Sequence, residues 1–261
     1  MTEKSYKNLK FLNSKHARSI RILCEYEEPK NRFKNSQVEN TIVFFGSARA
    51  ISKSDAKKKL DAAKLIDDKN SRKLEIKKAK RLVKLSKYYD MTDQLANKIT
   101  AWVREENKNY HIVTGAGPGI MEAANRGAFR ADEKRSVGLG ISLPFESELN
   151  PYISEDLDFE FHYFFTRKYW FLYFCKALIV CPGGFGTMDE LFEFLTLRQT
   201  GKIQKEIPTV LLGKKFWDDF LNFEALIDYG VISEKDLDMF IITDSVGEAY
   251  QFLKKNLDKE I

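Results

Sequence analysis

The stretch that decides the fold is ALIVCPGGFGTMDELFEFLTLRQ, residues 177–199. Its first five residues are an apolar run closed by proline and glycine, a pattern typical of a buried strand in a parallel sheet. Its last nine residues have the apolar spacing of an amphipathic helix. The sequence therefore predicts a strand, a glycine-rich turn and a helix in direct succession.

Short apolar runs of the same kind recur along the chain. We predict strands at 41–45, 111–114, 137–142, 177–181, 208–212 and 239–242, and helices near 90–107, 119–131, 166–176, 188–199, 216–228 and 245–256. Alternating strands and helices predict a parallel sheet covered on both faces and joined by right-handed crossovers. We therefore expect an α/β fold, a Rossmann-like doubly wound parallel sheet over residues 41–261.

Two segments interrupt this alternation. Residues 1–40 are expected to form an N-terminal helical extension, with a helix near 15–27 and a linker over 29–40. Residues 52–88 hold 14 Lys and Arg against five acidic residues. We interpret them as a lysine-rich helical insertion with a solvated face. The alternative is a basic patch for nucleic acid or another acidic surface.

The composition is that of an ordinary folded protein. Hydrophobic residues make up 43% and charged residues 31% of the 261 residues, which argues against global disorder. No apolar run reaches the ~18 residues needed to span a bilayer, and the N-terminus lacks the apolar segment of a signal peptide. We therefore expect a cytoplasmic protein. The cysteines and histidines show no metal-ligand or disulfide spacing, so no metal is expected.

The loop at 181–190, CPGGFGTMDE, is the strongest candidate site. Glycine lets the backbone approach a phosphate closely and adopt positive φ. Free N–H groups at the start of the following helix favour an anion, and Thr187 can add a hydroxyl or cap the helix. The net charge of +5 also suits an anionic ligand. A nucleoside 5′-monophosphate held by its phosphate fits this loop, although a turn without a ligand has the same sequence.

Two further loops follow predicted strands, so they lie at the same carboxyl ends of the sheet, where ligands bind. Residues 114–122, TGAGPGIME, nearly match a dinucleotide fingerprint, but Ile120 stands where the last glycine should be, and no acidic residue ends a clear second strand. This loop is expected to hold the ribose or base of a mononucleotide, or to be a compact turn. Ser47, after the first strand, either contacts the ligand or turns the chain.

Charged residues near these loops suggest chemistry. Arg167 and Lys168 open a predicted helix with Thr166 as its cap, where cations oppose the helix dipole unless an anion lies nearby. Asp189 and Glu190 follow the glycine loop, where the dipole favours carboxylates. A carboxylate beside a bound nucleotide can also position water or stabilise an oxocarbenium-like transition state during hydrolysis of an N-glycosidic bond.

These residues resemble the Lonely Guy family of cytokinin riboside 5′-monophosphate phosphoribohydrolases, many of which are labelled possible lysine decarboxylase. The family pattern PGGxGTxxE stands at 182–190 as PGGFGTMDE, a pattern similar to GxGPGIMEAAN stands at 115–125, and an Arg-Lys pair stands at 167–168. The resemblance covers about 41–250. The extension and the lysine-rich insertion resemble the longer branch of the family.

The resemblance implies a Rossmann fold, a homodimer or higher oligomer, and hydrolysis of AMP or N6-modified AMP to free base and ribose 5-phosphate without a cofactor. Arg167 and Glu190 would be the catalytic pair. The residues expected to bind substrate are Ser47, Gly117, Gly119, Glu148, Lys168, Gly183, Gly184, Phe185, Gly186, Thr187, Met188, Asp189 and Thr196.

Three other functions remain open at this point. A non-catalytic nucleotide-binding Rossmann protein would share the loops but not the reaction. A nucleic-acid-binding protein rests on the lysine-rich segment alone, and we do not expect nucleic acid or membrane as partners. Lysine decarboxylation would need a pyridoxal phosphate on a Schiff-base lysine, and Lys168 is the one lysine near the predicted loops.

Overall fold

The computed structural model describes residues 3–143 and 149–258. Within them, seven strands form one sheet in the order β4-β3-β2-β1-β5-β6-β7, and every neighbouring pair is parallel. The strands are β1 (Thr41–Phe45), β2 (His111–Thr114), β3 (Ser136–Ile141), β4 (Asp158–Phe161), β5 (Cys175–Val180), β6 (Thr209–Leu212) and β7 (Ile241–Thr243). The predicted Rossmann-like parallel sheet is confirmed. The direction of winding reverses between β1 and β5.

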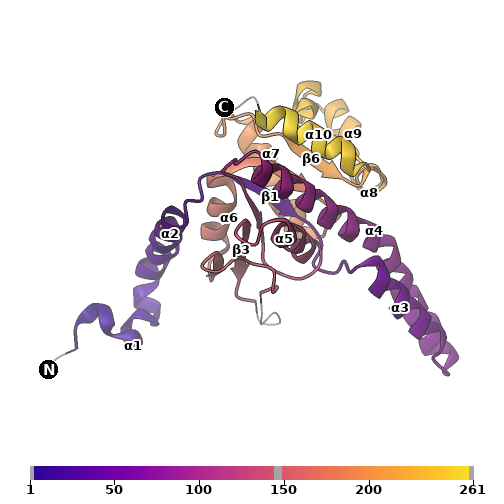
Figure 1. Ribbon diagram of the computed structural model, residues 1–261, viewed down its shortest axis with the longest axis horizontal. Helices are drawn as coiled ribbons and strands as arrows, with labels where there is room; N and C mark the ends of the chain where they lie inside the picture. Colours follow the sequence, from indigo (N-terminus) through magenta and orange to yellow (C-terminus); the bar gives the residue numbers. More distant parts are fainter. Residues whose placement is uncertain (1–2, 144–148, 259–261) are drawn as a thin grey trace.

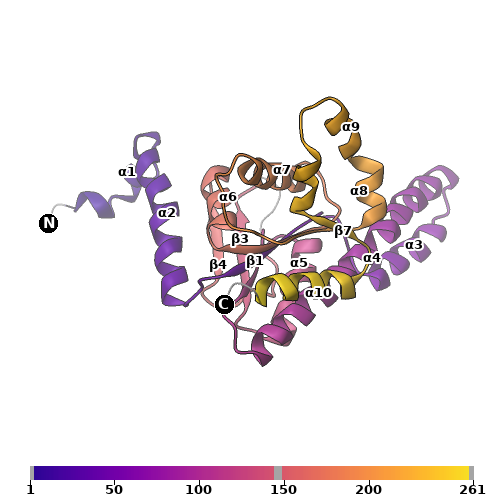
Figure 2. The ribbon, with the colours of Figure 1, turned by 90° about the horizontal axis from the view of Figure 1, so that it is seen from above.

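Helices cover both faces of the sheet (Figures 1 and 2). They are α1 (Leu9–Leu12), α2 (Arg18–Asn35), α3 (Lys53–Lys64), α4 (Lys69–Glu105), α5 (Ile120–Ala131), α6 (Phe164–Tyr173), α7 (Phe185–Gln199), α8 (Lys214–Phe220), α9 (Phe223–Asp228) and α10 (Val246–Leu257), with 3-10 turns at Ser5–Lys7, Lys15–Ala17 and Glu234–Met239. Helices α4, α5 and α10 pack on one face. Helices α6, α7 and α8 pack on the other with the end of α2.

Strand β1 shows why the sequence reads as a continuous apolar run. Ile42 and Phe44 are fully buried under α4, α5 and α10. Val43 and Phe45 are buried on the opposite face, against α6 and α7. The interior positions of a central strand covered on both faces are apolar, because side chains alternate between the faces.

The N-terminal helix is longer than its sequence predicts. We expected it to end before Pro29, but α2 runs on to Asn35. A proline inside a helix deprives the carbonyl four residues earlier of its N–H donor. That carbonyl belongs to Glu25, and the indole Nε1–H of Trp170 donates to it at 3.0 Å. The carbonyl is therefore paired, and the predicted linker over 29–40 is wrong as far as Asn35.

The lysine-rich segment forms α3 and the first half of α4. The helix that we expected near 90–107 is the end of α4, which begins at Lys69 and is 37 residues long. The carboxylate of Asp68 accepts from the backbone N–H of Ser71 and caps this helix. Helix α3 lies alongside α4, and the two project away from the sheet, on the side opposite to α1 and α2 (Figures 1 and 2).

Two further elements differ from the expectation. Strand β4 at the sheet edge was not predicted, because its four residues alternate exposed and buried and lie among acidic residues. The helix expected over 216–228 is two helices, since Asn222 breaks the pattern and accepts from the N–H of Ala225 as the cap of α9. No helix within 3–143 and 149–258 is long and apolar enough to cross a membrane.

Candidate active site

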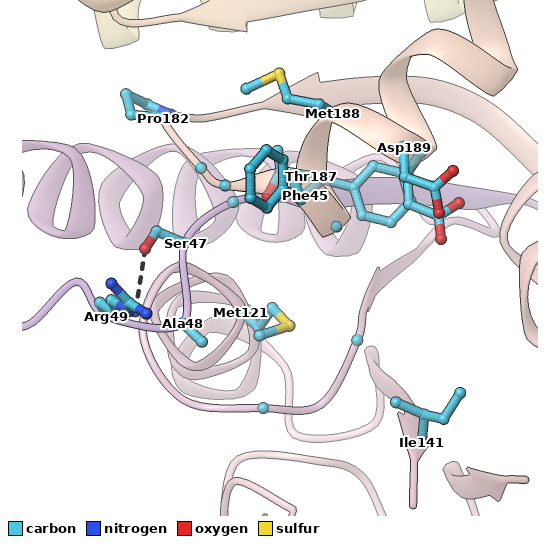
Figure 3. A pocket seen from close by; sticks show the side chains of 18 of the residues that line it. Phe45, Ser47, Ala48, Arg49, Met121, Ile141, Pro182, Thr187, Met188 and Asp189 are labelled. Carbon is cyan, nitrogen blue, oxygen red and sulfur yellow. Dashed lines mark hydrogen bonds between the residues drawn. The ribbon is translucent and has the colours of Figure 1, made fainter. Parts of the chain in front are cut away.

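A cavity of about 790 Å³ opens at the carboxyl ends of the strands (Figure 3). Residues that follow β1, β2, β3 and β5 line it, together with side chains of α6, α7 and α8. The loops after β1 and β5 meet here, since the N–H of Ser47 donates to the carbonyl of Pro182 at 3.0 Å. The cavity therefore lies at the point where the winding of the sheet reverses, which is where ligands bind in open parallel sheets.

The glycine-rich loop leads into α7 without a side-chain cap. Helix α7 begins at Phe185, and its N-cap residue is Gly184. The first N–H groups of a helix have no acceptor within the helix. Because the loop residues line the cavity, these donors and the positive end of the helix dipole are available to an anion there. Of the two roles suggested for Thr187, a hydroxyl donor to the ligand or a helix cap, the cap is absent, because no side chain caps this helix.

The three loop glycines serve different purposes, and none has the positive φ that we considered. A Cβ atom on Gly183 would lie 2.1 Å from the Thr187 hydroxyl, so glycine is required there by packing. A Cβ atom on Gly184 or Gly186 would meet nothing within 4 Å. These two positions face open space, and their lack of a side chain leaves room for a ligand.

The side-chain amides of two buried asparagines hold the loop after β2 in place. Asn150 Nδ2 donates to the carbonyls of Ala116 and Gly117 at 3.0 and 3.2 Å, and to Asn125 Oδ1 at 2.9 Å. Ala116 has a φ of 62°, which is unusual for a residue other than glycine. The amides of Asn125 and Asn150 thus hold the loop in shape, a role that the sequence analysis missed.

Gly119 supports the same region from the other side. Its φ is +77°, and a Cβ atom on it would lie 2.3 Å from the carbonyl of Ser47. The N–H of Ile120 donates to that carbonyl at 3.0 Å. The Ser47 hydroxyl accepts from the N–H of Arg49 at 3.1 Å (Figure 3). Ser47 both turns the chain and lines the cavity, whereas Gly119 positions the loop that carries Ser47.

Arg167 lies on α6 and reaches across the ends of β2 and β3. Its Nε donates to the carbonyl of Leu139 at 2.7 Å, and its Nη2 donates to the carbonyl of Gly115 at 3.3 Å. The guanidinium also lies over the ring of Phe171, 5.1 Å from its centroid. These contacts fix the orientation of a permanent positive charge in the cavity wall. Thr166 is not the helix cap, because α6 begins at Phe164.

Glu190 is the buried carboxyl of the cavity. It lies on α7, and the residue is 8% exposed. Burial raises the pKa of Glu190 to about 7, although the positive charges of Lys168 and Arg167 act in the opposite direction. A carboxyl group with such a pKa can exchange a proton near neutral pH, as a general base or acid must.

Lys168 connects α6 to a cluster of carboxylates on α7. Its Nζ lies 2.6 Å from Glu193, 2.9 Å from Asp189 and 3.8 Å from Glu190. Burial opposes the charge of this amine, but its hydrogen bonds to Glu193 and Asp189 raise its pKa overall. Lys168 is therefore a fixed cation beside Glu190, and it does not line the cavity itself.

The structure brings most of the predicted site residues to one cavity. Those that line it are Arg167, Glu190, Ser47, Gly117, Gly183, Gly184, Phe185, Gly186, Thr187, Met188 and Asp189. Lys168 and Gly119 lie behind the lining. Thr196 is further along α7, where its hydroxyl donates to the carbonyl of Phe192 at 2.7 Å. This residue does not line the cavity. Glu148 lies outside the described residues.

The apolar part of the cavity was not predicted from the sequence. Side chains from α4, α5 and α8 contribute to it, among them Leu85, Met121, Phe216 and Phe220. These residues come from distant parts of the chain, so no local pattern marks them. They add apolar side chains to a cavity that the loops also line.

A family model described as "Possible lysine decarboxylase" matches residues 121–253, just over half of the chain. The chain belongs to this family. The Lonely Guy proteins are among its members, as the resemblance at 182–190 implied.

Two curated proteins that are similar to this chain carry names of the same reaction type. A pyrimidine/purine nucleotide 5′-monophosphate nucleosidase of Escherichia coli K12 is 29% identical over an alignment of 164 residues that covers 58% of this chain and 35% of that protein. The cytokinin riboside 5′-monophosphate phosphoribohydrolase LOG of Oryza sativa subsp. japonica is 40% identical over 62 residues, 23% of this chain and 25% of that protein. The chain thus spans about a third or less of these relatives.

Among solved structures, the X-ray structure of TM1055, a structural genomics target, aligns with a TM-score of 0.45 at 17% identity and covers 83% of this chain and 99% of that one. The molybdenum cofactor binding protein of Rippkaea orientalis aligns with a TM-score of 0.39 at 19% identity and covers 64% and 88%.

Proposed function

We propose that this protein hydrolyses the N-glycosidic bond of a nucleoside 5′-monophosphate to release the free base and ribose 5-phosphate. The observation that carries the proposal is the buried carboxyl of Glu190, with a pKa of about 7, in the same cavity as the glycine-rich loop and Arg167. The names of the curated relatives, a nucleotide 5′-monophosphate nucleosidase and a phosphoribohydrolase, support it.

The loop at 183–187 would hold the 5′-phosphate. The start of α7 offers backbone N–H groups and a positive dipole end, and Gly184 and Gly186 leave space for the phosphate oxygens. Binding energy from the phosphate would then orient the ribose, whose glycosidic bond is the one that breaks. Glu190 lies in the second turn of the same helix, so its carboxyl and the phosphate site are on one rigid element.

Glu190 would act on the water that attacks the anomeric carbon. As a carboxylate it accepts a proton from this water and stabilises the positive charge that develops on the ribose as the bond to the base nitrogen breaks. The departing base takes up a proton, so the reaction consumes one water. The guanidinium of Arg167 is too weak an acid to donate that proton. It would instead bind a phosphate oxygen or the base.

The apolar part of the cavity suits the base. Leu85, Met121, Phe216 and Phe220 give the cavity a surface that fits adenine, with or without an apolar N6 substituent. AMP and N6-prenylated AMP, the precursor of a cytokinin, are therefore the proposed substrates. Side-by-side turnover of the two nucleotides distinguishes nucleotide salvage from cytokinin formation.

The same geometry disfavours a lysine Schiff base. A lysine that forms one must be available as the neutral amine, which a lowered pKa favours. Lys168 is instead surrounded by three carboxylates, and its pKa is raised. We therefore propose nucleotide hydrolysis for this family member in place of the decarboxylation that the family description suggests.

We also propose that the protein works in the cytoplasm as a homodimer or higher oligomer. Phe185, at the mouth of the cavity, is 97% exposed, and Phe164 on the neighbouring helix α6 is 54% exposed. Large apolar side chains gathered at one opening are typical of surfaces that another subunit covers. Light scattering after size-exclusion chromatography measures the oligomeric state.

Incubation with a panel of nucleoside 5′-monophosphates tests the proposed function. We expect free base and ribose 5-phosphate in equal amounts from at least one adenine nucleotide, with no release from the corresponding nucleoside, which lacks the phosphate. The second candidate is a non-catalytic nucleotide-binding protein. It would bind AMP without forming either product, and that result would exclude the hydrolase.

A further inference from the structure

A second cavity, of about 860 Å³, lies at the amino ends of the strands, whereas the candidate active site lies at their carboxyl ends. Glu39 precedes β1, Arg135 precedes β3 and Phe174 precedes β5, and His111 is the first residue of β2. All four line this cavity. The two cavities share no lining residue, so a ligand here would be separate from the nucleotide.

The second cavity contains an unpaired buried group. His111 is 6% exposed, and its Nδ1 has no hydrogen-bond partner. Burial, together with the positive charge of Arg135, lowers the pKa of His111 to about 4, although the negative charge of Asp132 acts in the opposite direction. The hydroxyl of Thr41, the register partner of His111 on β1, is also buried without a partner. Buried polar atoms are rarely left unpaired, because losing water without a replacement costs free energy.

The side chains that line the cavity include more cations than carboxylates, but three of the cations have acidic partners: Lys30 pairs with Glu27 at 3.9 Å, Lys108 with Asp258 at 2.9 Å and Arg135 with Asp132 at 3.4 Å. Five cationic side chains and two carboxylates line the cavity; the cations are Lys30, Lys34, Lys108, Lys134 and Arg135, and the carboxylates are Glu39 and Asp132.

The two carboxylates are already engaged. Asp132 accepts from Arg135 Nε at 3.4 Å and from the backbone N–H of Lys134 at 3.0 Å, and Glu39 lies 3.5 Å from the amide nitrogen of Asn109. Over the described parts of the chain, neither Lys34 nor the side chain of Lys134 forms an ion pair. A water molecule could also pair with His111, but the amines of Lys34 and Lys134, which have no acidic partner among the described residues, favour an anion.

We infer that this cavity is a second binding site, which takes a phosphate group. A phosphate oxygen would accept a hydrogen bond from the His111 ring at the floor, and the amines of Lys34 and Lys134 would balance its charge at the mouth. The volume exceeds what an inorganic phosphate ion fills, so a phosphate monoester of a small metabolite also fits. This inference does not depend on the reaction proposed for the cavity at the carboxyl ends of the strands.

The histidine ring itself reports binding. Imidazole ¹H–¹⁵N NMR spectra of the intact chain should separate His111 from His16 and His162, which serve as internal references. Inorganic phosphate and ribose 5-phosphate are titrated separately at constant ionic strength. We expect a saturable change at His111 and a rise in its pKa, since a nearby anion favours the imidazolium form. Phosphate at the glycine-rich loop does not produce this signal.

A pair of charge-matched variants decides the result. Lys34→Ala combined with Lys134→Ala should weaken the response about tenfold, whereas Lys57→Ala combined with Lys59→Ala on α3 should leave it unchanged. All four lysines are exposed, so both variants should fold. Tighter binding of ribose 5-phosphate would assign the site to phosphate esters, and a response to inorganic phosphate alone would assign it to the free ion. No change at His111 with either anion, or equal weakening in both variants, would overturn the inference.

Discussion

Replacement of Glu190 by Gln is expected to stabilise the folded protein, and to do so more strongly at high pH. Burial raises the pKa of this carboxyl from 4.5 to about 7. Each pKa unit corresponds to about 1.4 kcal/mol. Keeping the ionised carboxylate in the folded state therefore lowers the free energy of unfolding by about 3 kcal/mol. Glutamine keeps the shape of the side chain and carries no charge.

The direction of the pH dependence follows from proton binding. Between pH 4.5 and about 7, the folded protein retains a proton on Glu190 that the unfolded chain has lost. The free energy of unfolding of the wild type should therefore fall as the pH rises through this window. The variant lacks this proton, so its advantage over the wild type should be small at the acidic end and reach about 3 kcal/mol above the window.

Urea unfolding of both proteins at the two ends of the window measures the difference. Glu133→Gln is the control, because it removes an exposed carboxylate of the same kind. Its effect on the free energy of unfolding should be small and similar at both pH values. If Glu190→Gln changed stability equally at both ends, or destabilised the protein at the alkaline end, the carboxyl would not be held in the environment described above.

Three further predictions follow from the site and its supports. The kcat/KM for AMP should rise with pH through about 7, the pKa of Glu190, because its carboxylate form is the base, and a pH–rate profile checks this. Gly184→Ala should fold normally, since its Cβ would meet nothing within 4 Å, but should weaken nucleotide binding about tenfold or more by calorimetry because the methyl group enters the phosphate site. Trp170→Phe should lower the free energy of unfolding by about 1–3 kcal/mol, because it removes the N–H donor to the Glu25 carbonyl. Its effect should shrink when Pro29→Ala restores a backbone donor to that carbonyl, and a double-mutant cycle in urea measures both.

Local patterns in the sequence were enough to predict six of the seven described strands and the loop that carries the site. The strands β1 and β2 have the bounds that were predicted, and their polar residues Thr41, His111 and Thr114 lie at strand ends. This agreement has a physical cause: the interior of a central strand covered on both faces is apolar. The loop at 182–187 was equally visible, because its glycines and the strand before it are contiguous.

Features that depend on distant contacts were not predictable. The helix continues through Pro29 because Trp170, 145 residues after Glu25, supplies the missing donor. The edge strand β4 lacks a continuous apolar run because one of its faces is exposed. The apolar part of the cavity joins side chains from α4, α5 and α8. In each case the decisive partner is remote in sequence, so the local pattern does not contain it.

The raised pKa of Glu190 also required the structure. Its position after the glycine loop fits two roles, a carboxylate that is favoured by the helix dipole and a carboxylate that takes part in hydrolysis. The structure shows it buried, with Lys168 held beside it by Asp189 and Glu193. A buried carboxyl that destabilises the folded state is typical of functional sites, where chemistry and stability conflict.

A crystal structure of the protein soaked with AMP tests the central claim most directly. We predict the 5′-phosphate against the backbone N–H groups at the start of α7, with the ribose facing the carboxyl of Glu190. A nucleotide bound away from this loop, or a Glu190 side chain that points away from the sugar, would contradict the proposed function.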